Sequence, residues 1–147
     1  MEYATRAGAV TSRYFGETED LLPKYAWYQK NSRQKTWPVG SLKPNDLGLF
    51  DIQGNLFVWC QESYKEYPSG KGEEAAEDRE DGLVITSTDR RVTRGGSFAD
   101  QSSRLRSADR DVSMPTYNNY NYGLRLARTF PLGSFTALPP TTEGGRK

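Results

Sequence analysis

The stretch PVGSLKPNDLGLFDIQGNLFVWC, residues 38–60, is the most informative part of this 147-residue chain. Its second half, residues 47–60, is the most apolar run of the sequence. Gln53-Gly54-Asn55 is a typical turn sequence, so the run predicts two short strands joined at that turn. Phe57 and Trp59 stand two residues apart, so on a strand they share one face, and we expect that face to belong to the core.

On the N-terminal side of this stretch, the sequence predicts little regular structure. Residues 1–8 (MEYATRAG) are typical of a helix end, with Gly8 as the C-terminal cap. Residues 9–46 are irregular in pattern and rich in aromatic side chains.

On the C-terminal side, two more short strands are expected at 84–86 and 91–94. Residues 68–82 (PSGKGEEAAEDREDG) form an acidic loop, interpreted as a solvated insertion, with a calcium or partner site as the alternative. The alternation in GLRLAR, residues 123–128, predicts that Leu124 and Leu126 point inward while Arg125 points out. Residues 131–147 have the composition of a disordered tail.

Composition excludes several classes of site. The chain has no histidine and one cysteine, so it cannot build a Ser-His-Asp triad, a Cys/His zinc site or an internal disulfide by itself. A formal net charge of +1 argues against nucleic-acid and membrane partners. The sequence offers neither a signal-peptide core nor a transmembrane run, and the compartment stays open.

Nine tyrosines, six phenylalanines and three tryptophans offset a low hydrophobic content of 35%. Short aromatic-rich strands set in long loops, with little helix, predict a loop-rich α+β fold.

Four phrases occur in a fixed order: residues 38–60, then RVTRGGSF (91–98), RLRSADR (104–110) and YGLRLAR (122–128). Together they resemble the C-terminal half of the sulfatase-modifying factor family, whose type member is the formylglycine-generating enzyme. The resemblance implies a variant of the C-type-lectin-like fold over residues 1–130. The family's N-terminal strands have no counterpart here, so we expect a partial domain, either a fragment of a longer product or a truncated paralogue.

The resemblance also bears on catalysis. Catalytic members carry two cysteines after the GGS phrase, which bind copper(I) and oxidise a substrate cysteine with oxygen. Counted from Ser97, those positions hold Asp100 and Leu105, and neither supplies the thiolate that copper(I) requires. Cys60 is expected to be a lone buried thiol. A copper site and formylglycine formation by this mechanism are therefore not expected.

Calcium sites of the family are weakened in the same way. Val58 replaces the acid of the family's GN-x-x-E-W phrase, and Trp27 follows Tyr25-Ala26 where relatives carry an asparagine. Calcium takes about six to eight oxygen ligands. The resemblance therefore implies at most a weak calcium site, with Asn55 as its ligand.

By resemblance, Trp59 and Ser97 line the groove in which active members bind their peptide. Residues 116–122 (TYNNYNY) have the Tyr- and Asn-rich composition of recognition surfaces, although an ordinary family loop is the alternative. Arg106 and Arg110 are either buried arginines satisfied by loop carbonyls or part of an anion or substrate site. The candidate groove residues are Trp59, Ser97, Asp100, Gln101, Ser102, Arg104, Arg106, Arg110, Tyr117, Asn118, Asn119, Tyr120 and Tyr122.

Three functions follow as hypotheses. The first is a non-catalytic domain that binds a peptide or other ligand in the inherited groove, with its own missing N-terminal half or other domains as further partners. The second is an accessory domain of a larger oxidoreductase whose metal ligands lie outside this chain. The third is a variable display protein of a diversity-generating retroelement, because Asn, Tyr, Ser and Asp at 99–122 are what mutation of adenine-rich codons produces.

Overall fold

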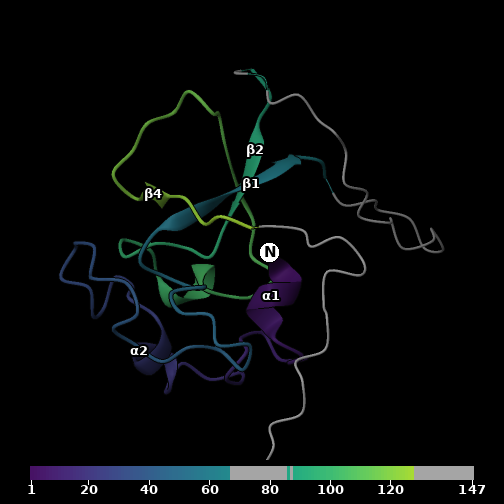
Figure 1. The fold of residues 1–147 in the computed structure, drawn as a ribbon. Helices are drawn as coiled ribbons and strands as arrows, with labels where there is room; N and C mark the ends of the chain where they lie inside the picture. Colours follow the sequence, from purple (N-terminus) through teal and green to yellow (C-terminus); the bar gives the residue numbers. More distant parts are fainter. Residues whose placement is uncertain (67–85, 87, 128–147) are drawn as a thin grey trace, which may run out of the picture.

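The computed structural model describes residues 1–66, 86 and 88–127 (Figure 1). Within this part of the chain the regular elements are helix α1 (Glu2–Arg6), helix α2 (Leu22–Tyr25), the 3-10 helix η1 (Ser102–Arg104), and strands β1 (Phe57–Ser63), β2 (Arg91–Arg94), β3 (Asp111–Ser113) and β4 (Tyr122–Gly123). The sheet occupies the upper half of Figure 1, and the short helices lie among long loops below it. The predicted loop-rich character is confirmed.

The four strands form one sheet in the order β3-β2-β1-β4. Strand β2 lies at the predicted position, is antiparallel to both β1 and β3, and is buried along its whole length. Strand β4 is parallel to β1, with Phe57 opposite Tyr122. The sheet therefore joins segments that are far apart in the sequence, because β1 lies between β2 on one side and β4 on the other.

Only one of the two strands predicted around Gln53-Gly54-Asn55 forms, and residues 47–56 make no strand. Gly54 has a φ of +76°, and a Cβ atom there would lie 2.4 Å from the Trp27 carbonyl oxygen. The Gly54 N–H donates to the Gly95 carbonyl and the Asn55 N–H to the Trp27 carbonyl, both at 2.8 Å. The segment before β1 thus bonds to two loops, which replace the predicted partner strand.

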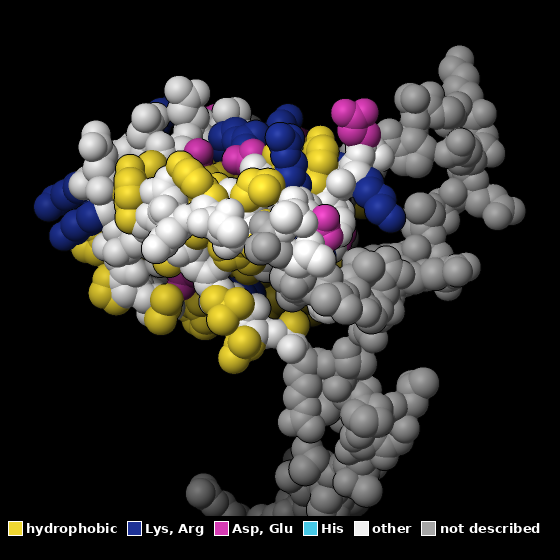
Figure 2. All heavy atoms as spheres, turned by 90° about the horizontal axis from the view of Figure 1, so that it is seen from above, with side chains coloured by type: hydrophobic (Ala, Val, Ile, Leu, Met, Phe, Trp, Pro, Cys, Tyr) yellow, Lys and Arg dark blue, Asp and Glu magenta, His cyan; other side chains and the backbone are white. Residues whose placement is uncertain are grey.

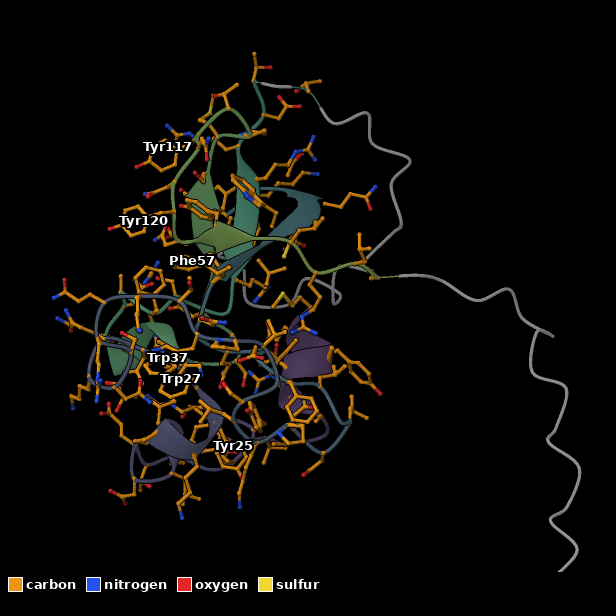
Figure 3. All side chains as sticks on the ribbon, turned by 60° about the vertical axis from the view of Figure 1, so that its left-hand side comes forward. Tyr25, Trp27, Trp37, Phe57, Tyr117 and Tyr120 are labelled. Atoms are coloured by element: carbon orange, nitrogen blue, oxygen red, sulfur yellow. The ribbon has the colours of Figure 1, made fainter. Side chains whose placement is uncertain are left out.

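Aromatic rings carry much of the core, as the composition predicts. Leu22, Ala26, Tyr28 and Leu105 form a buried cluster with Phe15 packed against it. Next to it the Phe15 and Tyr25 rings stack with their centroids 4.7 Å apart. The Trp27 and Trp37 rings stack at 4.5 Å, and Figure 3 shows them side by side below the sheet.

Buried polar side chains hold the loops in place. The Asn45 amide donates to the Ala4 carbonyl at 2.6 Å, and its oxygen accepts from the Leu47 and Leu49 N–H groups. The buried Arg13 guanidinium donates to the carbonyls of Glu17 and Ser102. Because buried polar groups are costly when unpaired, these bonds stabilise a fold with few regular elements.

Several local predictions need correction. Helix α1 ends at Ala7 in a left-handed conformation, one residue before the predicted cap Gly8. Leu124 and Leu126 are 77% and 86% exposed, so the inward orientation predicted for them is wrong. The reason is that β4 ends at Gly123, and no strand continues through these leucines.

Three predictions concern residues outside the described part of the chain: the acidic loop 68–82, residues 84 and 85 of the strand expected at 84–86, and the tail 131–147. None of the described helices is long or apolar enough to cross a membrane.

Candidate ligand-binding site

A shallow depression of about 550 Å³ lies where β3 and β4 approach the central strands. We call it the aromatic groove. Its lining residues are Arg90, Val112, Ser113, Met114, Thr116, Tyr117 and Tyr122. In Figure 3 the Tyr117 and Tyr120 side chains project on the same side of the molecule, with Phe57 nearby.

Tyr117 and Tyr122, which line the aromatic groove, belong to a set of packed rings centred on Tyr122. Phe57 and Trp59 lie 5.6 and 5.1 Å from it, centroid to centroid, and Tyr117 meets it edge-on at 6.0 Å. The register of β4 on β1 sets this cluster, since it places Tyr122 opposite Phe57. Both β1 side chains contact the same ring, so the prediction that Phe57 and Trp59 share one face is confirmed.

The segment before β4 carries exposed polar and aromatic side chains. Tyr117 is 53% exposed and Tyr120 is 77% exposed. The Tyr117 N–H donates to the Met114 carbonyl, and Asn119 side-chain atoms contact the Tyr117 hydroxyl and the Tyr120 N–H. These local bonds give the segment a defined shape. Figure 2, a view from above, shows hydrophobic side chains exposed at several places among polar and charged ones.

The residues around the GGS phrase do not reach the aromatic groove. Ser97 is fully buried, and both its N–H and its hydroxyl donate to the Asp100 carboxylate. The Ser102 hydroxyl also has a partner within the protein, since it donates a hydrogen bond to the Glu19 carboxylate at 2.5 Å. Asp100 therefore closes a turn, and Ser97 is not an open groove residue, contrary to the interpretation by resemblance.

The three arginines of the 104–110 phrase lie elsewhere as well. Arg104 bonds to Asp109 and Asp111, at 3.4 and 2.9 Å. Arg106 is exposed, so its interpretation as a buried arginine is wrong, whereas Arg110 does donate to a loop carbonyl, that of Lys65. Within the described part of the chain, the buried arginines are instead Arg13, Arg91 and Arg94.

Asn55, the candidate calcium ligand, is buried and faces the Trp37 backbone. Its side-chain oxygen accepts from the Trp37 N–H and its amide donates to the Trp37 carbonyl, both at 3.0 Å. The described residues contain no group of three or more His, Cys, Asp or Glu side chains that could hold a metal ion.

Two titratable groups near the sheet are perturbed by burial. Burial raises the pKa of the Cys60 thiol, and the Glu62 carboxylate adds to this effect. Burial also raises the pKa of Asp109, although the Arg104 and Arg106 guanidinium groups oppose the shift. The Cys60 thiol is consequently a poorer nucleophile at neutral pH than an ordinary cysteine.

Of the predicted residues, the structure brings together Trp59, Tyr117 and Tyr122. Sequence reasoning missed five groove residues: Arg90, Val112, Ser113, Met114 and Thr116. Thr116 begins the Tyr- and Asn-rich segment, and residues 112–114 lie just before it, which was the available signal. Arg90 had no such signal, and β3 has only three residues and gives no readable periodicity.

Comparison with known proteins supplies the family. The pattern of the sulfatase-modifying factor enzyme 1-like domain matches residues 1–130. The chain therefore belongs to the sulfatase-modifying factor family. This sulfatase-modifying-factor-like domain is 30% identical to the formylglycine-generating enzyme of Streptomyces coelicolor over 161 aligned residues, covering 92% of the chain and 46% of that protein.

Two solved structures share the fold of this sulfatase-modifying-factor-like domain. Treponema denticola variable protein 1 superposes with a TM-score of 0.69 at 31% identity, over 84% of this chain and 42% of that chain. PvdO from Pseudomonas aeruginosa gives 0.64 at 25% identity, over 84% and 47%. The fold is thus the predicted C-type-lectin-like variant of the formylglycine-generating-enzyme type. The chain spans less than half the length of these relatives.

Proposed function

We propose that this sulfatase-modifying-factor-like domain is a non-catalytic module that binds a peptide or other ligand in the aromatic groove. The observation that carries the proposal is the ring cluster of Phe57, Trp59 and Tyr122, with the half-exposed Tyr117 at its edge. Aromatic rings bury a large area at small entropic cost, because few torsions have to be fixed.

The groove offers polar groups as well as apolar surface. Ser113, Thr116 and Tyr117 bring hydroxyls, and Arg90 adds a cation at the rim. A volume of about 550 Å³ lies in the range of ordinary ligand sites. Apolar walls with a few polar groups suit an extended peptide that places aliphatic or aromatic side chains on the rings.

The two positions that hold copper ligands in catalytic relatives support a non-catalytic role. Leu105 is fully buried in the core cluster with Leu22, Ala26 and Tyr28. Asp100 accepts two bonds from Ser97 and its carbonyl accepts from the Gln29 N–H. Both positions therefore have structural roles that a copper-binding thiolate does not fill.

Binding is tested by selecting from a phage-displayed library of random peptides and measuring the affinity of the synthesised winners by calorimetry. Tyr117→Ala should weaken them about tenfold, as expected for losing one aromatic contact surface. Tyr3→Ala is the matched control, because Tyr3 is an exposed tyrosine on α1. The proposal fails if no peptide is enriched, or if Tyr117→Ala binds as tightly as Tyr3→Ala.

Catalysis is tested separately. The chain is incubated with a Cys-x-Pro-x-Arg peptide, copper and oxygen, and the peptide is examined by mass spectrometry. We expect no conversion of cysteine to formylglycine. Appearance of the aldehyde product above the enzyme-free background would show that the domain is catalytic.

A second candidate is a variable display protein, favoured by the likeness to Treponema denticola variable protein 1. In this chain Tyr117, Asn118 and Tyr120 are exposed, as residues diversified for binding have to be. A near-identical template repeat beside the gene, differing at adenines, would decide for it. Without such a repeat, the display hypothesis is refuted while ligand binding in the groove still stands.

A further inference from the structure

A second depression, of about 490 Å³, shares no lining residue with the aromatic groove. We call it the basic pocket. Its lining residues are Arg6, Ser12, Tyr64, Arg106, Ala108, Asp109 and Arg110. We propose that the basic pocket binds the phosphate or sulfate group of a small organic molecule.

The charge balance of the lining favours an anionic ligand. The lining contains three cationic side chains, those of Arg6, Arg106 and Arg110, and one carboxylate, that of Asp109. This carboxylate lies 3.4 Å from Arg104 and 3.4 Å from Arg106, so two guanidinium groups compensate its charge. Glu2 offsets part of the Arg6 charge through an ion pair of 2.9 Å. The lining still holds more cations than anions, and guanidinium groups bind tetrahedral oxyanions through paired N–H donors.

The arginines are held in place by the protein itself. Arg6 donates through Nε to Glu2 and through Nη1 to the Thr11 carbonyl, at 2.9 and 3.1 Å. Arg110 donates to the Lys65 carbonyl at 2.8 Å and lies over the Tyr64 ring, 5.3 Å from its centroid. A guanidinium carries five N–H donors, so Arg6 keeps donors for a ligand. Groups fixed in this way lose little side-chain entropy when an anion binds.

Arg106 is the arginine best placed to respond to a ligand. Its side chain is 57% exposed, and it makes a single long bond of 3.4 Å to Asp109. Because surface ion pairs of this kind contribute little to stability, its removal should leave the fold intact.

The size of the pocket indicates that the anion is carried by a larger molecule. A volume of 490 Å³ exceeds what a bare sulfate or phosphate ion fills, since one water takes about 30 Å³. The half-exposed Tyr64 side chain offers surface to the organic part of such a ligand.

The test is a calorimetric or NMR titration of the chain with inorganic phosphate, inorganic sulfate and acetate at constant ionic strength. Phosphate or sulfate should bind saturably, and acetate, a planar monoanion, at least about tenfold more weakly. Arg106→Gln should weaken the dianion about tenfold or more, the effect of losing a charge-assisted bond. Arg106→Lys, which keeps the charge and loses the fork, should fall between. Arg33→Gln, at another exposed arginine, is the matched control.

The proposal is overturned if neither dianion binds saturably, if acetate binds as tightly as phosphate, or if Arg106→Gln and Arg33→Gln behave alike. The phosphate and sulfate arms distinguish the two sources of the dianion, and the tighter one identifies the ligand class. Tyr117→Ala should leave anion binding unchanged, and Arg106→Gln should leave peptide binding unchanged. Failure of the basic pocket is therefore separable from failure of the aromatic groove.

Discussion

Gly54 should be the least replaceable glycine of the segment that leads into β1. Its φ of +76° disfavours any L side chain, at a cost of roughly 1–2 kcal/mol for alanine. In addition, a Cβ would lie 2.4 Å from the Trp27 carbonyl oxygen and 3.0 Å from the Trp27 nitrogen. Backbone atoms cannot rotate away, so overpacking adds about 1–3 kcal/mol. We expect Gly54→Ala to lower the free energy of unfolding by about 2–5 kcal/mol in total.

Gly48→Ala is the matched control. Gly48 has nearly the same φ, +75°, but no atom lies within 4 Å of its hypothetical Cβ. The control should therefore lose only the conformational part, roughly 1–2 kcal/mol. Both substitutions stiffen the unfolded chain equally, so this effect cancels in the comparison.

The assay is urea unfolding followed by tryptophan fluorescence, since Trp27 and Trp37 stack beside Gly54 and report on this region. The difference between the two variants isolates the close approach to Trp27 and should be about 1–3 kcal/mol. Equal destabilisation by Gly54→Ala and Gly48→Ala would refute the reasoning, because it would mean that the Trp27 backbone does not restrict this position.

Three further predictions concern single side chains. Burial and the Glu62 carboxylate raise the pKa of the Cys60 thiol, so iodoacetamide should alkylate Cys60 near pH 8 more slowly than it alkylates a cysteine peptide. Glu62→Gln should speed the alkylation of Cys60. A Cys60 rate equal to that of the peptide would contradict this prediction. Burial raises the pKa of Asp109 in the folded state, so its contribution to stability is fully present below the unfolded pKa of about 3.9 and is lost as the pH rises through the folded value. Asp109→Asn should remove this component from a pH series of urea midpoints, and an unchanged pH profile would count against it. Leu126 is 86% exposed, so Leu126→Asp should change the free energy of unfolding by less than about 0.5 kcal/mol in urea unfolding. A large loss of stability would show that Leu126 is a core residue.

The parts of the fold with a local signal could be predicted from the sequence. Helix α1 and strand β2 lie within a residue or so of their expected positions, and Phe57 and Trp59 share a face as their spacing requires. Strands β3 and β4 have three and two residues, too few for a periodic pattern. Their places are set by pairing with distant strands, which no local propensity encodes.

The candidate site, like the fold, could be predicted from the sequence only where a local pattern encodes it. The exposure of Tyr117, Asn118 and Tyr120 agrees with the polar composition of their segment. The packing of Trp59 on Tyr122 follows from the parallel register of β4 on β1. The prediction for Ser97 failed because its burial depends on the Asp100 carboxylate, which folds back and accepts a hydrogen bond from the Ser97 N–H. The arginines at 104, 106 and 110 lie outside the groove and bond to Asp109, to Asp111 and to the Lys65 carbonyl just after β1.

The burial of Leu105 and the bonding of Asp100 make cysteine costly for stability at both of these positions. Leu105→Cys would remove a fully buried side chain from the core and cost about 1–3 kcal/mol, and Asp100→Cys would leave the buried Ser97 without its acceptor. A chain that gained the two cysteines one at a time would therefore pass through a less stable intermediate. Selection for stability alone favours keeping leucine and aspartate at these two positions.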